Sequence, residues 1–207
     1  MFVEPFYQSG VYEAMTRKTK HSVFFSLGLM ATLGWFAIWL LSWDPEEFAV
    51  YDAIVRAAYG GPDISHNVIL DATEPLGRWG VTPFHSKTLG LPLSVRANYA
   101  VKNFFRFHVP PTMHLGNPYT LTSQNELIAS YDERQSKTQR AAELRDLIRQ
   151  DWGVITLSRV GFDLHRKHAV VYAQLIYCGL CGGGDYFYLS KVNGAWHVTS
   201  RAGTWIS

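Results

Sequence analysis

The N-terminal part of the chain contains the uncharged stretch SVFFSLGLMATLGWFAIWLLSW, residues 22–43. A helix rises ~1.5 Å per residue, so this stretch would form a rod about 33 Å long, which exceeds the ~30 Å hydrocarbon core of a bilayer. Within lipid, backbone polar groups must bond to one another, and a helix meets that condition. The stretch therefore predicts one transmembrane helix over residues 22–43.

The charges that flank this stretch indicate its orientation. Arg17, Lys18 and Lys20 precede it, whereas acidic residues follow it. Basic residues next to a membrane span are retained on the cytoplasmic side. We therefore expect residues 1–21 to form a cytoplasmic tail and residues 44–207 to form a periplasmic or extracellular domain.

Two other interpretations of the stretch are less favoured. A cleaved signal peptide would have an apolar region of ~7–15 residues and a site of Ala-x-Ala character. Here the run is longer and ends in Ser42-Trp43-Asp44. A buried core helix is the second alternative, but core helices rarely stay uncharged on every side over such a length.

Five residues of the stretch are predicted to contact a partner. Trp35, Trp39 and Trp43 recur every four residues and share one helix face. They indicate an interfacial aromatic belt, or a stripe that packs on another helix. Gly28 and Thr32 form a small-xxx-small pair that permits close helix approach. The expected partners are the lipid bilayer and other membrane protein subunits.

The chain that follows is predicted to begin with a helix over 45–59. Asp44 suits the N-cap, Pro45 suits the first helical position, and Glu47 lies three residues after the cap. This helix follows the apolar stretch without a linker, which would hold the domain close to the membrane.

Two further helices are expected. One covers 94–105 and directs Val95, Tyr99 and Phe104 or Phe105 inward. The other starts with a capping box of Ser136 and Gln139 and ends near residue 151.

The C-terminal third is predicted to be an antiparallel sheet. Its strands are expected over 154–157, 169–177, 186–192 and 196–200, and two short strands are expected earlier in the chain, over 67–71 and 127–131. Asn193-Gly194 joins the strands over 186–192 and 196–200, because both turn positions of such a hairpin favour positive φ. The predicted fold class is therefore α+β: one N-terminal transmembrane helix, then a single domain over 44–207 whose antiparallel sheet packs on helices.

The charge balance of the 207 residues excludes several classes of protein. Nineteen Lys and Arg against seventeen Asp and Glu leave a net charge of +2, and 47% of the residues are hydrophobic. A nucleic-acid-binding surface needs clustered basic residues, whereas those of segment 134–149 are interspersed with acidic ones. A disordered chain would be less hydrophobic. We therefore expect a folded protein that binds no nucleic acid.

The segment with Cys178 and Cys181 is the most unusual part of the sequence. It continues into three glycines, and three interpretations are open: a redox pair, a zinc site with His165 and His168, or a local disulfide. Nine strand residues at ~3.3 Å each would separate the cysteines from the histidines by about 30 Å. That distance excludes one four-ligand zinc site, and the disulfide is favoured. No cofactor or metal is expected.

Few other residues suggest catalysis. Asp71 and Glu74 follow a predicted strand, and with His85 they could perform acid–base chemistry. Strand-end capping explains the carboxylates equally well. His108 and His114 flank two prolines and offer a weaker metal-binding alternative. We therefore assign no catalytic residue from sequence.

The ending YLSKVNGAWHV, residues 188–198, resembles the closing hairpin of NTF2-like (cystatin-like cone) domains. In that family a helix pair packs on a curved antiparallel sheet around a pocket. Segments 158–162 and 178–182 are similar to uncharacterised bacterial membrane-anchored proteins, which implies no activity. The NTF2-like resemblance implies a pocket for a small apolar ligand, with Tyr172 and Tyr186 among its lining residues.

Three functions follow from these features. The favoured one is a single-pass membrane-anchored binding or assembly module, an accessory subunit of a larger membrane complex. The first alternative is the NTF2-like ligand-binding domain. The second is an acid–base enzyme that uses Asp71, Glu74 and a histidine.

Overall fold

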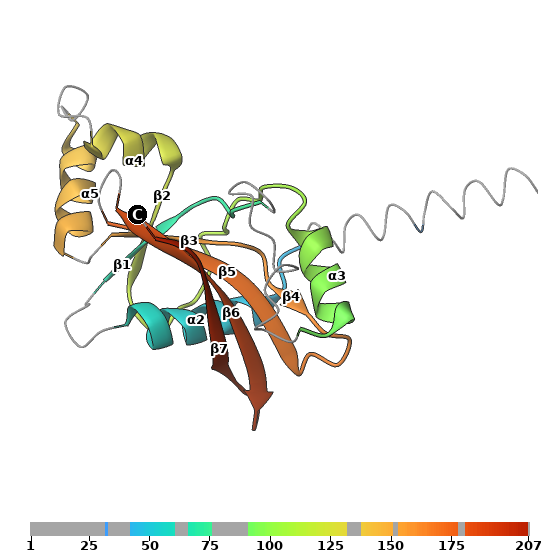
Figure 1. Cartoon of the computed structure of the whole chain (residues 1–207). Coiled ribbons are helices and arrows are strands. Elements are labelled where there is room, and N and C mark those ends of the chain that lie inside the picture. The colour runs from blue at the N-terminus through green and yellow to red at the C-terminus, as the bar shows by residue number, and fades with distance from the viewer. Residues whose placement is uncertain are drawn as a thin grey trace, which may run out of the picture. The chain divides into compact units, whose positions relative to one another are not determined.

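A mixed seven-stranded β-sheet forms the centre of the domain in the computed structural model (Figure 1). The structure describes residue 32 and residues 42–60, 66–75, 91–131, 138–150, 153–177 and 181–206. Within these residues the strands run in the order β2-β1-β3-β5-β6-β7, and β4 pairs with β5. Their bounds are β1 Asn67–Leu70, β2 Tyr119–Thr122, β3 Val154–Leu157, β4 Gly161–Phe162, β5 His168–Ile176, β6 Gly182–Val192 and β7 Ala195–Ile206.

The C-terminal part of the sheet is antiparallel, as the sequence predicts. Strands β3, β5, β6 and β7 pair antiparallel in that order. Asn193 has φ 51° and Gly194 has φ 83° at the turn between β6 and β7. Positive φ at both positions is the requirement of a two-residue type I′ turn. The predicted hairpin is therefore confirmed, with both strands longer than expected.

Strand β1 departs from the antiparallel pattern. It lies parallel to both β2 and β3, with Val68 opposite Thr120 on one side and Val154 on the other. Parallel neighbours need crossover connections rather than tight turns, and helices occupy these connections. The strand predicted over 127–131 is wrong, because these residues belong to one of those helices.

Helices cover both faces of the sheet. Their bounds are α2 Pro45–Ile54, continued by the π-helix η1 Val55–Tyr59, then α3 Leu93–Lys102, α4 Gln124–Tyr131 and α5 Gln139–Gln150. Figure 1 shows α4 and α5 at the end of the sheet with β1 and β2, and α3 at the end with β4.

Two hydrophobic clusters lie on one face of the sheet. Under α3, Val95 and Tyr99 pack against Tyr172 and Tyr186. Under α5, Leu144 and Ile148 pack against Val68, Leu70 and Val154. The opposite face carries α2 and η1, because the ring of Tyr59 meets the ring of Phe187 edge-on at 6.2 Å. Successive residues of a strand point to opposite faces. Tyr186 therefore packs in the layer that contains α3, whereas Phe187 packs in the layer that contains η1.

Local capping explains why α4 is a helix. The Oγ of Ser123 accepts a hydrogen bond from the backbone N–H of Glu126 at 3.2 Å. In return, Oε2 of Glu126 accepts from the backbone N–H of Ser123 at 2.9 Å. This reciprocal capping box fixes the first turn. The box predicted for α5 is not tested, because Ser136 lies outside the described residues; Thr138 Oγ1 accepts from the backbone N–H of Ala141 there.

The predicted transmembrane segment falls almost wholly outside the described residues. Of residues 22–43, the structure describes only Thr32, Ser42 and Trp43, and residues 1–21 are not described. No helix within the described part of the chain is long and apolar enough to cross a membrane. The membrane anchor therefore stays a prediction. Residues Asp44–Ser207 form one compact unit, separate from Met1–Trp43.

Candidate interaction surface at the start of helix α2

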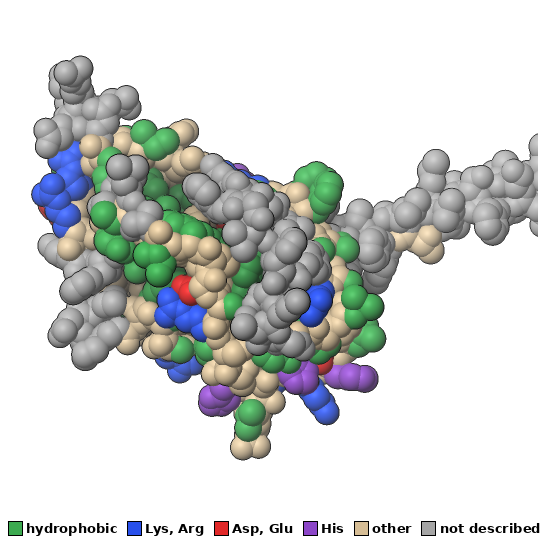
Figure 2. Space-filling model, viewed as in Figure 1, with side chains coloured by type: hydrophobic (Ala, Val, Ile, Leu, Met, Phe, Trp, Pro, Cys, Tyr) green, Lys and Arg blue, Asp and Glu red, His purple; other side chains and the backbone are tan. Residues whose placement is uncertain are grey.

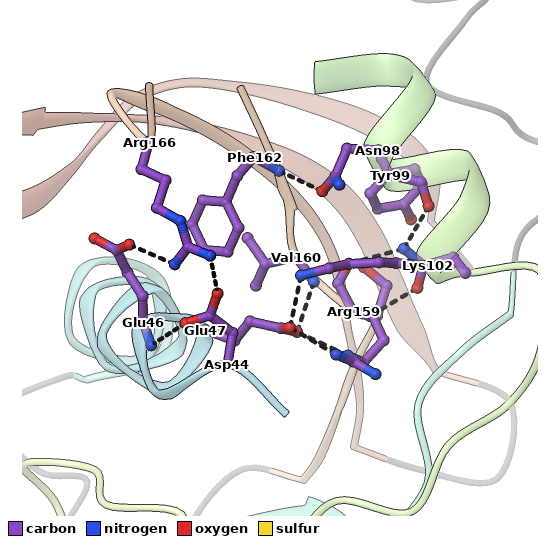
Figure 3. Close-up of polar contacts among 12 residues, drawn as sticks. Asp44, Glu46, Glu47, Asn98, Tyr99, Lys102, Arg159, Val160, Phe162 and Arg166 are labelled. Carbon is purple, nitrogen blue, oxygen red and sulfur yellow. Dashed lines mark hydrogen bonds and ion pairs between the residues drawn. The ribbon is translucent and has the colours of Figure 1, made fainter. Parts of the chain in front are cut away.

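A buried ion network centres on Glu47 in the first turn of α2 (Figure 3). Its Oε1 accepts hydrogen bonds from Lys102 Nζ at 2.8 Å and from Arg159 Nη2 at 2.7 Å. Its Oε2 accepts from Arg159 Nε at 2.8 Å. The side chains of Glu47 and Arg159 are fully buried. Buried charges are tolerated only when paired and hydrogen-bonded, so this carboxylate holds two cations inside the domain.

The guanidinium of Arg159 stays charged in this setting. Burial on its own would lower the pKa of Arg159, but the hydrogen bonds and negative charge of Glu47 outweigh it and raise the pKa. The same group lies over the ring of Phe107, 5.0 Å from its centroid. A cation over an aromatic face gains further electrostatic stabilisation.

Hydrogen bonds from α2 and α3 also hold the segment that carries Arg159. The side-chain amide of Asn103 donates to the carbonyl of Arg159 at 2.8 Å and accepts from its backbone N–H at 2.7 Å. The hydroxyl of Tyr51 donates to the carbonyl of Ser158 at 2.8 Å. The start of α2, the end of α3 and segment 158–160 therefore form one interlocked unit.

A second set of charges surrounds the N-terminus of α2 nearer the surface. Arg166 contacts Asp44 Oδ2 at 2.5 Å and Glu46 Oε2 at 3.0 Å, and Lys191 pairs with Glu46. Burial would raise the pKa of Asp44, but its bonds to Arg166 and to the Glu46 N–H outweigh this and lower it. These pairs connect the first turn of α2 to the β4–β5 and β6–β7 hairpins.

Exposed aromatic side chains lie next to the buried network. Phe104 is 71% exposed and Phe105 is 63% exposed, and they follow Asn103, the C-cap of α3. Their rings meet edge-on, with centroids 4.9 Å apart. Val101 is also exposed, and Figure 2 shows hydrophobic side chains reaching the surface over and beside α3. The prediction that Phe104 or Phe105 points inward is wrong, because Val95, Tyr99 and Lys102 occupy the buried face of α3.

Most predicted partner-contact residues remain untested. Gly28, Trp35 and Trp39 lie outside the described residues, whereas Thr32 is helical and exposed and Trp43 is half-buried. Their predicted contacts with lipid or with other subunits therefore stay predictions.

The cysteine segment is described only in part. Cys181 is disulfide-bonded, whereas Cys178 lies outside the described residues, so the predicted pairing stays a prediction. The glycines that follow have a packing role. A Cβ at Gly184 would strike the hydroxyl of Tyr172 and lie 2.5 Å from Trp205 Nε1. The missing side chain leaves room for the Trp205 indole to donate to the Tyr172 hydroxyl at 2.7 Å.

Asp71 and Glu74, the carboxylates proposed for acid–base chemistry, lie in the segment directly after β1. Asp71 Oδ2 lies 3.9 Å from Nδ1 of the exposed His108. Glu74 is buried, and its backbone N–H donates to the carbonyl of Leu157. His85 lies outside the described residues. The enzyme alternative therefore gains no support from the arrangement of Asp71 and Glu74.

The next residues are the histidines considered for a zinc site and the tyrosines expected to line a pocket. His168, Tyr172 and Tyr186 each contact another side chain of the domain. His168 Nδ1 lies 2.9 Å from Asp163 Oδ2, while His165 is exposed in the turn before β5. Among the described residues there is no group of three side chains suited to hold a metal ion. Tyr172 and Tyr186 pack against each other, with ring centroids 5.2 Å apart, in the cluster under α3.

The sequence reasoning missed the buried network. Glu47 is expected as a capping residue, and Lys102 and Arg159 are not singled out. One available signal is Arg159 itself, because it interrupts a run in which residues 154–157 and 160–162 are otherwise typical of a buried strand. A charge in such a run requires a buried partner.

Comparisons of this chain with protein-family models, with curated proteins and with solved structures found no match. The resemblance of residues 188–198 to NTF2-like domains therefore stays a prediction.

Proposed function

We propose that this chain is a single-pass membrane-anchored binding and assembly module that serves as an accessory subunit of a larger membrane protein complex. Residues 22–43 form the anchor, and residues 44–207 form the periplasmic or extracellular domain.

One observation carries this proposal. The apolar stretch ends at residue 43, Asp44 caps α2, and Glu47 is already bound inside the domain core. The folded domain therefore begins at the residue that directly follows the proposed anchor in the sequence. A domain that follows its anchor so closely in sequence stays near the membrane, within reach of other proteins in the same membrane, which suits an assembly module.

The form of the connection adds support. Asp44 and Glu46 bind Arg166, and Glu47 binds Arg159, so three residues of one turn contact two separate segments of the domain. Fraying of the first turn would break buried as well as surface contacts. The start of α2 is therefore held firmly by the rest of the domain.

The test is purification of the full chain from its native membrane in mild detergent. We expect it to remain in the membrane after alkaline extraction and to migrate in native gels with other membrane proteins. The double substitution Trp35→Ala and Trp39→Ala should release these proteins while the chain stays in the membrane. A lone monomer that retains no other protein would contradict the assembly role, and release by alkali would contradict the anchor.

A further inference from the structure

We propose that the outer face of α3 docks an amphipathic helix of another protein, and that acidic side chains flank the apolar face of that helix. This partner would belong to the complex of the proposed function, so the proposal rests on that function and specifies the chemistry of one of its contacts.

The outer face of α3 carries an apolar stripe. Leu93, Ala97 and Val101 recur at every fourth residue and are all exposed, Leu93 to 81%. Residues at this spacing lie on one side of a helix. Phe104 and Phe105 follow at the end of α3 and are exposed as well. Single apolar residues on a surface are ordinary, but a series of large ones on one face marks an interaction site.

The opposite face of α3 holds this stripe in place. Val95 and Tyr99 pack in the hydrophobic cluster between α3 and the sheet. Lys102 Nζ donates to Glu47 Oε1 at 2.8 Å inside the domain. A partner therefore meets a helix that is already ordered, and binding does not have to include the cost of ordering it.

The charges around the stripe select an acidic partner. Residues 91–125 contain no Asp or Glu. No carboxylate of the described residues pairs with Arg96 or Arg106: Arg96 Nε is buried without a hydrogen-bond partner, and Arg106 donates to the neutral amide of Gln124 at 3.2 Å. Positive charges that are not compensated within the domain attract acidic side chains and repel basic ones.

The shape of the stripe favours a helix over a lipid surface. The small Ala97 lies between the larger Leu93 and Val101, so a side chain of a second helix can pack between them, as in ridges-into-grooves packing. The ten residues of α3 span about 15 Å, which a partner helix of about three turns covers. A second copy of α3 has the same positive charges and no acidic residue, so like charges disfavour self-pairing.

The first experiment measures how two designed helical peptides bind the full chain in phosphatidylcholine liposomes. Each peptide is stapled into a helix and carries leucine at every fourth position. Glutamate flanks the leucines in one peptide, and lysine flanks them in the other. Fluorescence anisotropy of the labelled peptides gives the dissociation constants, and we expect the glutamate peptide to bind several-fold more tightly.

Three variants of the chain test the origin of this preference, and circular dichroism verifies that each is folded. Arg96→Glu with Arg106→Glu should reverse the preference, so that the lysine peptide binds more tightly. Leu93→Ser with Val101→Ser should weaken both peptides several-fold. Ile128→Ser is the matched control and should change neither, because Ile128 is 53% exposed on α4, at the opposite end of the sheet from α3 (Figure 1).

Two results of this experiment would overturn the proposal. One is equal binding of the two peptides by the unsubstituted chain. The other is a preference for the glutamate peptide that survives the charge reversal at positions 96 and 106.

The second experiment identifies the occupant in the native membrane. The full chain carries a photo-reactive amino acid at position 101, and the matched control carries it at position 128. We expect the segment cross-linked to position 101, as mapped by mass spectrometry, to come from another protein. That segment should have apolar residues at every third or fourth position and a net negative charge.

The other possible occupants are contrary outcomes of this experiment. A cross-link from position 101 to lipid, to a second copy of this chain or to a basic segment would overturn the proposal. No cross-link at position 101 in a chain that migrates with other membrane proteins would overturn the docking surface alone. A chain that migrates as a lone monomer would overturn the assembly role, and the docking surface with it.

Discussion

The carboxylate of Glu47 receives two hydrogen bonds from the guanidinium of Arg159, a residue 112 positions further along the chain. The pair joins the first helix of the domain to the segment between β3 and β4. With Lys102 added, one buried anion faces two buried cations. The arrangement makes the stability of the domain sensitive to a single carboxylate.

Glu47→Gln should therefore destabilise the domain strongly. The substitution leaves Arg159 and Lys102 buried without a countercharge, and breaking a buried pair in this way costs about 3–5 kcal/mol. Chemical denaturation measures the free energy of unfolding. Glu46→Gln is the matched control, because its partners Arg166 and Lys191 are partly exposed to solvent and its loss should lie closer to the about 0–1 kcal/mol of an exposed pair. Equal losses in the two variants would contradict the central role of Glu47.

Gly184→Ala should destabilise the sheet, whereas Gly183→Ala should not. The added Cβ at position 184 collides with the Tyr172 hydroxyl and with Trp205 Nε1, but at position 183 its nearest neighbour is a carbonyl at 3.4 Å. Overpacking of this kind costs about 1–3 kcal/mol. Thermal unfolding measures the stability of both variants. Similar stability of the two variants would show that Trp205 does not need the space at position 184.

Acid should weaken the turn before β5 through Asp163. Burial would raise the pKa of this carboxyl, but hydrogen bonds from the His168 ring and from the backbone N–H groups of Lys167 and His168 outweigh it and lower the pKa below 3.8. A carboxyl with a lowered folded-state pKa stabilises the fold above its unfolded pKa, and that stabilisation disappears as the pH falls through the folded value.

Unfolding measured at pH 7 and at pH 3 tests this expectation. Asp163→Asn should be less stable than the parent at pH 7, and the difference should shrink as the pH falls below the unfolded pKa of about 3.9 toward the lower folded value. A difference that stays constant between the two pH values would exclude titration of Asp163 as its source.

The cysteines should contain no free thiol in protein from the native membrane. The sequence has two cysteines, and Cys181 is disulfide-bonded. Alkylation before reduction should add no group, and alkylation after reduction should add a group to each cysteine, as read by mass spectrometry. A monomer mass under non-reducing conditions assigns the bond to Cys178 and Cys181, whereas a dimer mass would contradict that pairing.

Local chemistry made parts of this fold predictable. The Asn193-Gly194 turn depends on the φ values of two adjacent residues, and the cap of α2 depends on Asp44 and its neighbours. The predictions of this turn and of this cap are both correct because each depends only on residues that are close together in the sequence.

Long-range pairing made other parts unpredictable. The parallel position of β1 depends on Val154, far along the chain. Residues 127–131 are apolar enough for either a strand or a helix, and the capping box at Ser123 decides between them. From the sequence, Glu47 fits a role as an exposed capping residue or as a buried partner of a cation. Only the position of Arg159 shows that its side chain turns inward.

The ion network also sets an order of events during synthesis. Glu47 leaves the ribosome 112 residues before Arg159, which at ~5–20 residues per second is a delay of roughly 6–22 s. Throughout that interval the carboxylate lacks Arg159, which donates two of the hydrogen bonds that it accepts from cations in the folded domain. The ion network therefore cannot be complete until about three quarters of these 207 residues have been made, and earlier burial of the Glu47 carboxylate would leave its negative charge only partly compensated.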